Sequence, residues 1–161
     1  MNIFTTPSRI IITCNKRLSP YLQQEVIELG FTPERTFSTG IELRGTLNDC
    51  IRLNLSIRCA SQVLYSLKQF RANSPEEVYE TLLLFSWEDI MESDGYLSVT
   101  STVDHFTVNN NLFVNVKVKD AIADRMRRET SRRPDSGPEL DRTVIHLFWK
   151  EENAEIFIDT S

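Results

Sequence analysis

The chain has 161 residues, of which 40% are apolar and 25% charged, and its formal net charge is −5. This length allows one ordinary domain or two small ones, with enough aromatic residues for a core. No apolar run approaches the roughly 20 residues that cross a bilayer, the start lacks a basic segment followed by an apolar one, and the three cysteines are widely spaced. We therefore expect a cytoplasmic protein with reduced thiols and no membrane partner.

The first part of the chain alternates short apolar runs with helical patterns. A β-branched run begins the series, Ser19-Pro20 predicts a helix start, and Gly30 predicts its end. The predicted elements are residues 10–14, 19–30, 35–38, 40–44, 46–57 and 62–70. Their order, β-α-β-β-α-β, is that of the split βαβ, or ferredoxin-like, arrangement. We expect residues 1–72 to form a domain of this type.

A second helix-start pattern marks the next unit. Ser74 can cap a helix that has Pro75 in its first position and Glu77 three residues after the cap. The elements that follow are two helices near 75–85 and 87–91, a strand at 96–103, a long helix at about 110–130, a loop at 132–138 and a hairpin of strands at 143–149 and 154–158. We expect residues 73–161 to form a second small α+β unit beside the first, with a sheet of its own.

The long helix carries the only strong charge pattern in the chain. Between Asn115 and Arg133 there are seven basic residues and three acidic ones, a local balance of +4 that leaves −9 for the rest. A positive island on a negative body indicates a polyanion as ligand. The alternative is a solvated helix face, which is the usual role of charged helical stretches.

Position on the helix separates these cations. Arginines near its end interact favourably with the helix dipole, whereas Lys117 and Lys119 near its start oppose the dipole, a cost that an external anion would offset. Asparagine amides before the helix can donate to an anion or form a polar turn or cap. No interleaved aromatic residues are apparent, which favours backbone and shape contacts. The candidate contact residues are Asn110, Asn111, Lys117, Lys119, Arg125, Arg128, Arg132 and Arg133.

Patterns for other chemistry are weak. His105 and His146 are far apart in sequence, and no Cys-x-x-Cys pattern occurs, so no metal site is predicted. A Cys14 or Cys59 thiolate could pair with His146 in space, but no local pattern supports it. The five glycines never form Gly-x-Gly, so no phosphate-binding turn is encoded. We predict no catalytic, cofactor-binding or metal-binding residue in this chain.

The basic segment and the strands after it carry a resemblance. Lys117–Arg125, Arg132-Arg133-Pro134 and the hairpin up to Ser161 resemble the THUMP domain of bacterial RNA methyltransferases. They are most similar to the family that methylates guanine at the exocyclic amine in large-subunit rRNA, whose members are often labelled adenine-specific DNA methylases. Residues 57–61 resemble the junction of that family, and the first 70 residues its ferredoxin-like domain. The resemblance covers essentially the whole chain and implies an RNA-binding platform of two α+β units.

The sequence departs from this family in one respect. Family members continue into a Rossmann-like domain that binds S-adenosylmethionine and carries an Asn-Pro-Pro-Tyr-type motif, whereas the six prolines here never occur in tandem. The resemblance implies an RNA-binding region that positions RNA for a C-terminal methyltransferase domain of a parent protein. The expected RNA is rRNA, with tRNA as the alternative. We expect no cofactor and no activity for this chain alone.

Two readings without an RNA role remain beside this one. The chain could be a stand-alone interaction or dimerisation module, since ferredoxin-like units also serve in that way. It could also be a small metabolic enzyme, although no convergent catalytic set supports that class. The sequence does not indicate an oligomeric state.

Overall fold

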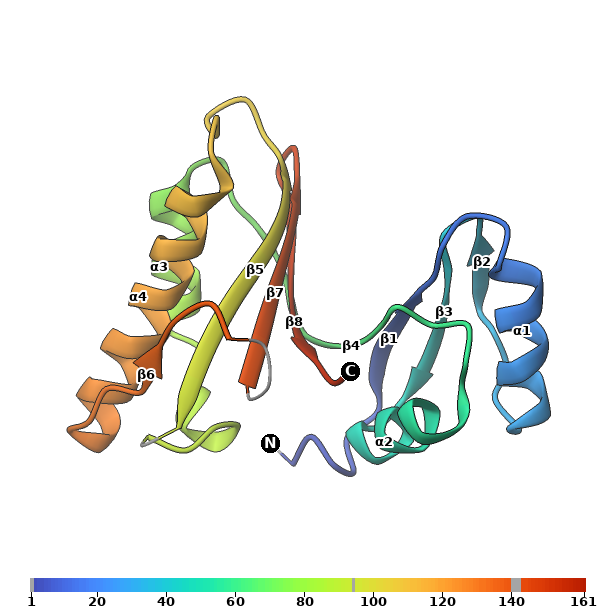
Figure 1. Cartoon of the computed structure of the whole chain (residues 1–161). Coiled ribbons are helices and arrows are strands. Elements are labelled where there is room, and N and C mark those ends of the chain that lie inside the picture. The colour runs from blue at the N-terminus through green and yellow to red at the C-terminus, as the bar shows by residue number, and fades with distance from the viewer. Residues whose placement is uncertain (1, 94, 140–142) are drawn as a thin grey trace. The chain divides into compact units, whose positions relative to one another are not determined.

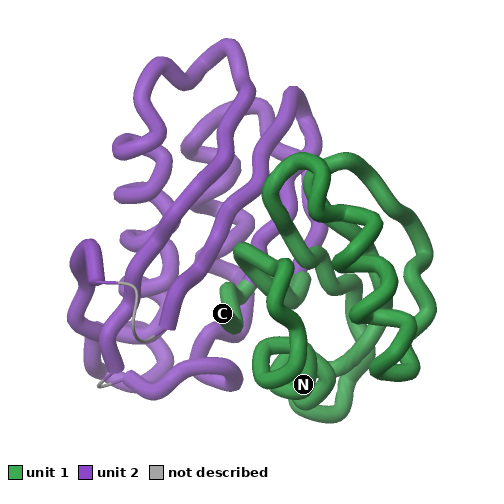
Figure 2. Tube along the Cα trace, turned by 45° about the vertical axis from the view of Figure 1, so that its right-hand side comes forward, with its two compact units in different colours: residues 1–67, 158–161 green, residues 68–157 purple. Residues whose placement is uncertain are grey.

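A computed structural model describes residues 2–93, 95–139 and 143–161 of the chain (Figure 1). These residues form two compact units (Figure 2). Unit 1 consists of residues 1–67 together with 158–161, and unit 2 of residues 68–157. Among the described residues no helix is both long and apolar enough to cross a membrane.

Unit 1 has the ferredoxin-like element order predicted above. Its elements are β1 (Ser8–Thr13), α1 (Ser19–Glu28), β2 (Arg35–Phe37), β3 (Gly40–Gly45), α2 (Leu47–Ser56) and the first part of β4 (Gln62–Arg71). The strands are hydrogen-bonded in the order β2-β3-β1-β4, and each neighbouring pair is antiparallel. The central strand β1 buries Ile10, Ile11 and Ile12, which gives this unit its core.

Local sequence signals explain both helices of unit 1, with one correction. α2 begins with a capping box, in which the Thr46 hydroxyl accepts from the Asp49 amide and the Asp49 carboxylate accepts from the Thr46 amide. α1 ends before Gly30, whose φ of 92° lies in the left-handed region that favours glycine. The predicted Ser19 cap is wrong. Ser19 lies inside α1, and its hydroxyl donates to the Phe37 carbonyl at 2.7 Å.

Unit 2 places two helices beside a mixed sheet. Its elements are the end of β4, α3 (Pro75–Leu83), the 3-10 helix η1 (Trp87–Asp89), β5 (Tyr96–Asp104), α4 (Asn111–Thr130), β6 (Asp135–Ser136), β7 (Thr143–Lys150) and β8 (Asn153–Asp159). The strand order is β4-β8-β7-β5-β6, in which β5 is parallel to both β6 and β7. α3 and α4 lie together on one side of β5 and β7 (Figure 1).

The capping and packing of unit 2 follow the predicted pattern. The Ser74 hydroxyl accepts from the Glu77 amide at the start of α3. Trp87 and Trp149 are fully buried, and each indole donates to a backbone carbonyl, that of Leu82 and that of Ala72 respectively. These two hydrogen bonds tie Trp87 to the end of α3 and Trp149 of β7 to the segment before α3.

Two details of the predicted architecture are wrong. The eight strands are hydrogen-bonded in one continuous order, β2-β3-β1-β4-β8-β7-β5-β6, rather than in two separate sheets. The reason is that β4 is a single ten-residue strand whose residues belong to both units. In addition, the expected loop at 132–138 contains the short strand β6, which pairs with Tyr96 and Leu97 of β5.

Candidate nucleic-acid interface

α4 carries most of the basic segment beside the residues that pack it against unit 2. Five apolar residues along one side of the helix, the apolar stripe of α4, are fully buried: Val114, Val118, Ala121, Ile122 and Met126. The helix starts at Asn111 and ends at Thr130, as expected from the sequence. The apolar stripe therefore orients the charged residues between its members toward solvent or toward the flanking elements.

Four arginines gather where α4 ends, and we call them the arginine cluster: Arg127, Arg128, Arg132 and Arg133. Ser131 adopts the left-handed conformation with φ of 64°, and its amide donates to the Arg127 carbonyl at 2.9 Å. This reversal turns the chain back, so that Arg133 reaches Asp124 nine residues earlier. The side chains of Arg127, Arg128 and Arg133 remain 61%, 50% and 44% exposed.

Asp124 organises the arginine cluster from within. Its carboxylate accepts from the Tyr79 hydroxyl at 2.6 Å and lies 3.8 Å from Arg127 and 3.5 Å from Arg133. The hydrogen bond to Asp124 raises the pKa of the Tyr79 hydroxyl, which therefore stays a neutral donor. Glu129 lies beside Arg128, so two carboxylates pair with three of the four arginines and the cluster keeps a positive surplus.

Lys117 lies further along the edge of α4 that carries Arg128. Its amine is 5.9 Å from the centre of the Tyr79 ring and 5.6 Å from that of Phe113. Residues 11 positions apart on a helix are separated by about 16 Å along the axis and only about 20° around it. Lys117 and Arg128 can therefore contact the same extended polyanion.

Lys119 is not brought together with Lys117. Two residues apart on a helix means about 200° around the axis, so the two side chains point to opposite edges of α4. Within the described parts of the chain, neither Lys119 nor Arg132 has an ion-pair partner within 4.0 Å. Their proposed contacts with RNA stay predictions, and those of Lys119 concern a different edge.

The two asparagines have structural roles at the start of α4. The Asn110 side chain caps the helix by accepting from the Leu112 amide at 2.9 Å, and the Asn111 amide donates to the Ser101 carbonyl at 3.2 Å. The sequence left open whether these amides contact an anion or form a polar turn or cap, and the structure shows the cap at Asn110. Whether these amides also contact a ligand stays a prediction.

Arg125 is engaged by an ion pair inside unit 2. Its guanidinium donates through Nη2 to Glu88 Oε1 at 2.8 Å and through Nε to Glu88 Oε2 at 3.1 Å, and its side chain is only 13% exposed. The hydrogen bond from Arg125 lowers the pKa of Glu88, and the same bond raises the pKa of Arg125. This geometry favours a structural role for Arg125 over a role in ligand contact.

Exposed aromatic rings are the feature of unit 2 that the sequence interpretation missed. Phe106 is 88% exposed and stacks on His105 with 4.7 Å between ring centres, and His105 stacks on Trp149 at 4.3 Å. Phe113 is 53% exposed below Lys117. Phe113 falls outside the apolar stripe of α4, and its position in the sequence could therefore have identified it as an exposed ring. Exposed rings next to cations can stack with unpaired bases.

The described residues of the chain contain no grouping suited to metal binding. No three His, Cys, Asp or Glu side chains among them converge in a way that could hold a metal ion. His105 is buried, with Nδ1 2.7 Å from the Thr107 hydroxyl, and His146 lies beside Thr100 at 2.8 Å. The basic surface of α4 is therefore the candidate site.

Comparisons with known proteins agree with this geometry. The family described as "RlmL ferredoxin-like domain" matches residues 9–64, and the THUMP domain family matches residues 72–159. Ribosomal RNA large subunit methyltransferase K/L of Magnetococcus marinus is 31% identical over 95% of this chain, which corresponds to 21% of that protein. The protein of the same name from Pseudomonas fluorescens strain Pf-5 is 32% identical over 94% of this chain and 20% of its own length.

Solved structures show the same fold. A predicted N6-adenine-specific DNA methylase of Listeria monocytogenes superposes with a TM-score of 0.80 at 23% identity, covering 97% of this chain and 41% of its own. TrmN of Thermus thermophilus superposes with a TM-score of 0.69 at 14% identity, over 97% of this chain and 46% of its own. The chain spans about a fifth of the length of its curated relatives. It belongs to the THUMP family, whose domains bind RNA, and joins that domain to an RlmL-type ferredoxin-like domain.

Proposed function

We propose that this chain binds rRNA and positions it for an S-adenosylmethionine-dependent methyltransferase domain of a longer protein. The curated relatives named above are ribosomal RNA large subunit methyltransferases, and the chain corresponds to about a fifth of each. An exposed arginine cluster, on a region whose described residues include no metal-binding group, suits RNA binding rather than methyl transfer. In this proposal, contacts of the chain with RNA phosphates fix the register of the RNA.

The arginine cluster is the observation that carries this proposal. Four guanidinium groups lie within seven residues, and three of them keep between 44% and 61% of their side chains exposed. Guanidinium groups bind phosphate oxygens in a bidentate manner, and a fixed cluster loses less side-chain entropy on binding than a flexible one. Asp124 supplies this fixation by holding Arg127 and Arg133.

A specific observation also supports the interaction-module alternative. α2 exposes Ile51 by 46% and Leu55 by 82%, and these residues are one helical turn apart. An apolar pair of this kind can contact another protein. The two functions are compatible, because this pair lies in unit 1 and the arginine cluster lies in unit 2.

Fluorescence anisotropy with labelled fragments of large-subunit rRNA tests the proposal, with tRNA as the parallel ligand. We expect binding of this chain alone with a Kd of about 10⁻⁴ to 10⁻⁶ M at physiological salt, as for contacts dominated by phosphates. Affinity should fall as salt rises, and rRNA should bind more tightly than tRNA. Tighter binding of tRNA would favour the alternative ligand, and no salt-dependent binding of either RNA would contradict the proposal.

A further inference from the structure

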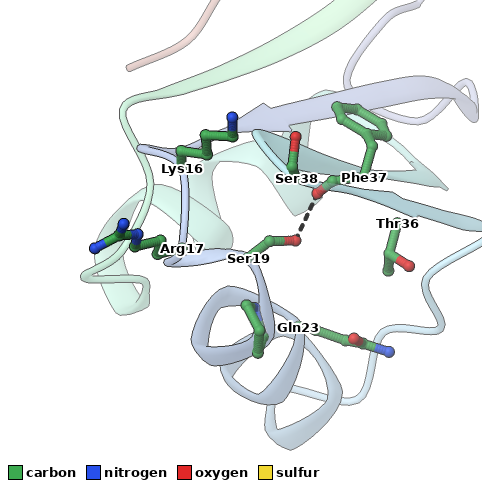
Figure 3. Close-up of a pocket in the computed structure, with 8 residues that line it drawn as sticks. Lys16, Arg17, Ser19, Gln23, Thr36, Phe37 and Ser38 are labelled. Atoms are coloured by element: carbon green, nitrogen blue, oxygen red, sulfur yellow. Dashed lines mark hydrogen bonds between the residues drawn. The ribbon is translucent and has the colours of Figure 1, made fainter.

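A groove in unit 1 has the chemistry of a nucleotide site. Its volume is about 480 Å³, and it opens between the loop before α1, the start of α1 and strand β2 (Figure 3). Its lining residues are Lys16, Arg17, Ser19, Pro20, Gln23, Thr36, Phe37 and Ser38. The lining combines two cations, three hydroxyl groups, one side-chain amide and one aromatic ring, without any carboxylate.

The cations of this groove are available to a ligand. Lys16 and Arg17 are exposed, and neither forms an ion pair within the part of the chain that the structure describes. The Lys16 amine and the Ser38 hydroxyl extend toward the same side as the Phe37 ring (Figure 3). The Arg17 guanidinium extends away from these groups, so it can meet an anion only at the rim.

The walls of the groove are held in place by the fold of unit 1. The Ser19 hydroxyl ties α1 to the Phe37 carbonyl at 2.7 Å, and the Cys14 amide donates to the Thr39 carbonyl at 2.7 Å. Phe37 pairs with Gly40 in the antiparallel ladder, where a Cβ on Gly40 would collide with the Ile12 carbonyl oxygen. Phe37 is nevertheless 40% exposed, so its ring offers an apolar face to solvent.

We propose that this groove binds one nucleotide of the RNA, as a contact separate from the arginine cluster. Lys16 binds a phosphate, Arg17 binds the neighbouring phosphate at the rim, and the Phe37 ring stacks with an unpaired base. The Ser38 and Thr36 hydroxyls serve as hydrogen-bond partners for the sugar or the base edge. The mixed polar lining disfavours an apolar protein segment as the occupant. This inference rests on the proposed RNA-binding function and assigns part of it to unit 1.

Three sets of variants test the groove with a labelled single-stranded oligoribonucleotide of mixed sequence. The groove set is Lys16→Gln/Arg17→Gln and, separately, Phe37→Leu. The arginine-cluster set is Arg132→Gln/Arg133→Gln. The charge-matched control is Arg44→Gln/Lys68→Gln, because both residues are exposed and lie outside the groove and the cluster. Circular dichroism verifies that each variant is folded.

Each groove variant has its own expected signature. Loss of both cations should reduce the log–log salt slope by about 1.4, or about 0.7 for each phosphate contact with a single strand. Phe37→Leu should weaken binding by about fivefold to a hundredfold without changing the slope, because stacking does not release counterions. The control should lower affinity only slightly.

The outcomes separate this inference from the proposed function. If both groove variants bind as the control does while the arginine-cluster variant loses affinity, the groove assignment is overturned and RNA binding through α4 stands. If neither set differs from the control, the proposed function fails as well. If the chain binds polyglutamate but not RNA, and Phe37→Leu leaves that binding unchanged, the groove is a site for acidic protein segments and the nucleotide assignment is wrong.

Discussion

Arg125 and Glu88 form a two-point ion pair between α4 and η1, with nitrogen–oxygen distances of 2.8 and 3.1 Å. The pair removes from the surface the arginine that lies nearest the middle of the basic segment. It also divides the basic residues by role, because the Arg125 side chain is only 13% exposed whereas those of Arg127, Arg128 and Arg133 remain 44% to 61% exposed. On α4, an arginine with a structural role therefore lies next to arginines that are available to a ligand.

Breaking this pair should affect stability more than RNA binding. We expect Arg125→Gln to lower the free energy of unfolding by about 1 to 3 kcal/mol, because it leaves the largely enclosed Glu88 carboxylate without its charged donor. RNA affinity and its salt slope should stay close to those of the wild type. Urea unfolding and anisotropy measure the two effects. A loss of slope as large as that of an arginine-cluster variant would place Arg125 in the interface instead.

The same pair predicts a pH dependence of stability. Because the hydrogen bond from Arg125 lowers the pKa of Glu88, the folded state binds its proton less readily than the unfolded state does. The stabilisation is therefore present above the unfolded pKa of a glutamate and is lost as pH falls through the lower folded value. Urea midpoints measured between neutral and acidic pH should decline more steeply for the wild type than for Glu88→Gln. Equal declines of the two urea midpoints would show that the pair contributes nothing to the loss of stability at acidic pH.

Lys117 and Lys119 should contribute unequally to RNA binding. Lys117 shares an edge of α4 with Arg128, whereas Lys119 points about 200° away from Lys117. We expect Lys117→Gln to reduce the salt slope by about 0.7 to 0.9 and Lys119→Gln to have a smaller effect. The two variants have the same charge change, so each is the control for the other. Equal losses would indicate that the RNA wraps around both edges of the helix.

Cys59 and Cys50 should react slowly and in a fixed order. Burial raises the pKa of Cys50 to about 12, and the hydrogen bond to Glu25 raises the pKa of Cys59. At neutral pH neither residue holds much thiolate, the reactive form. Cys59, which is partly exposed, should label first with a thiol reagent, and Cys50 only on unfolding. Rapid labelling of Cys50 in the native protein, observed in a Cys14→Ser/Cys59→Ser background, would contradict this assignment.

The sequence was sufficient for most local structure. Apolar spacing predicted a helix at about 110–130, where α4 spans Asn111–Thr130, and Ser74 was correctly identified as the cap of α3. Both are determined by residues within a few positions of one another. The continuous strand order was not predictable, because nothing local distinguishes a ten-residue β4 shared by both units from a strand that ends at their boundary.

The candidate site illustrates the same limit. The sequence identified the basic segment but not the individual roles of its members, since Glu88 lies 37 residues before Arg125. A count of charges treats Arg125 and Arg128 alike. In the structure the Arg125 side chain is 13% exposed and that of Arg128 is 50% exposed. The exposed Phe106 and Phe113 were missed for a related reason, because an aromatic residue in a globular chain is expected in the core until its exposure is known.

Salt titration of RNA binding by Arg132→Gln/Arg133→Gln tests the central claim most directly. Each titration would run between about 50 and 200 mM salt, with Arg44→Gln/Lys68→Gln as the matched loss of two positive charges outside the cluster. The account predicts that the cluster variant lowers the log–log slope by about 1.4 to 1.8 and that the control keeps nearly the wild-type slope. Equal slopes for the wild type and the cluster variant would show that the arginine cluster is only a solvated end of α4.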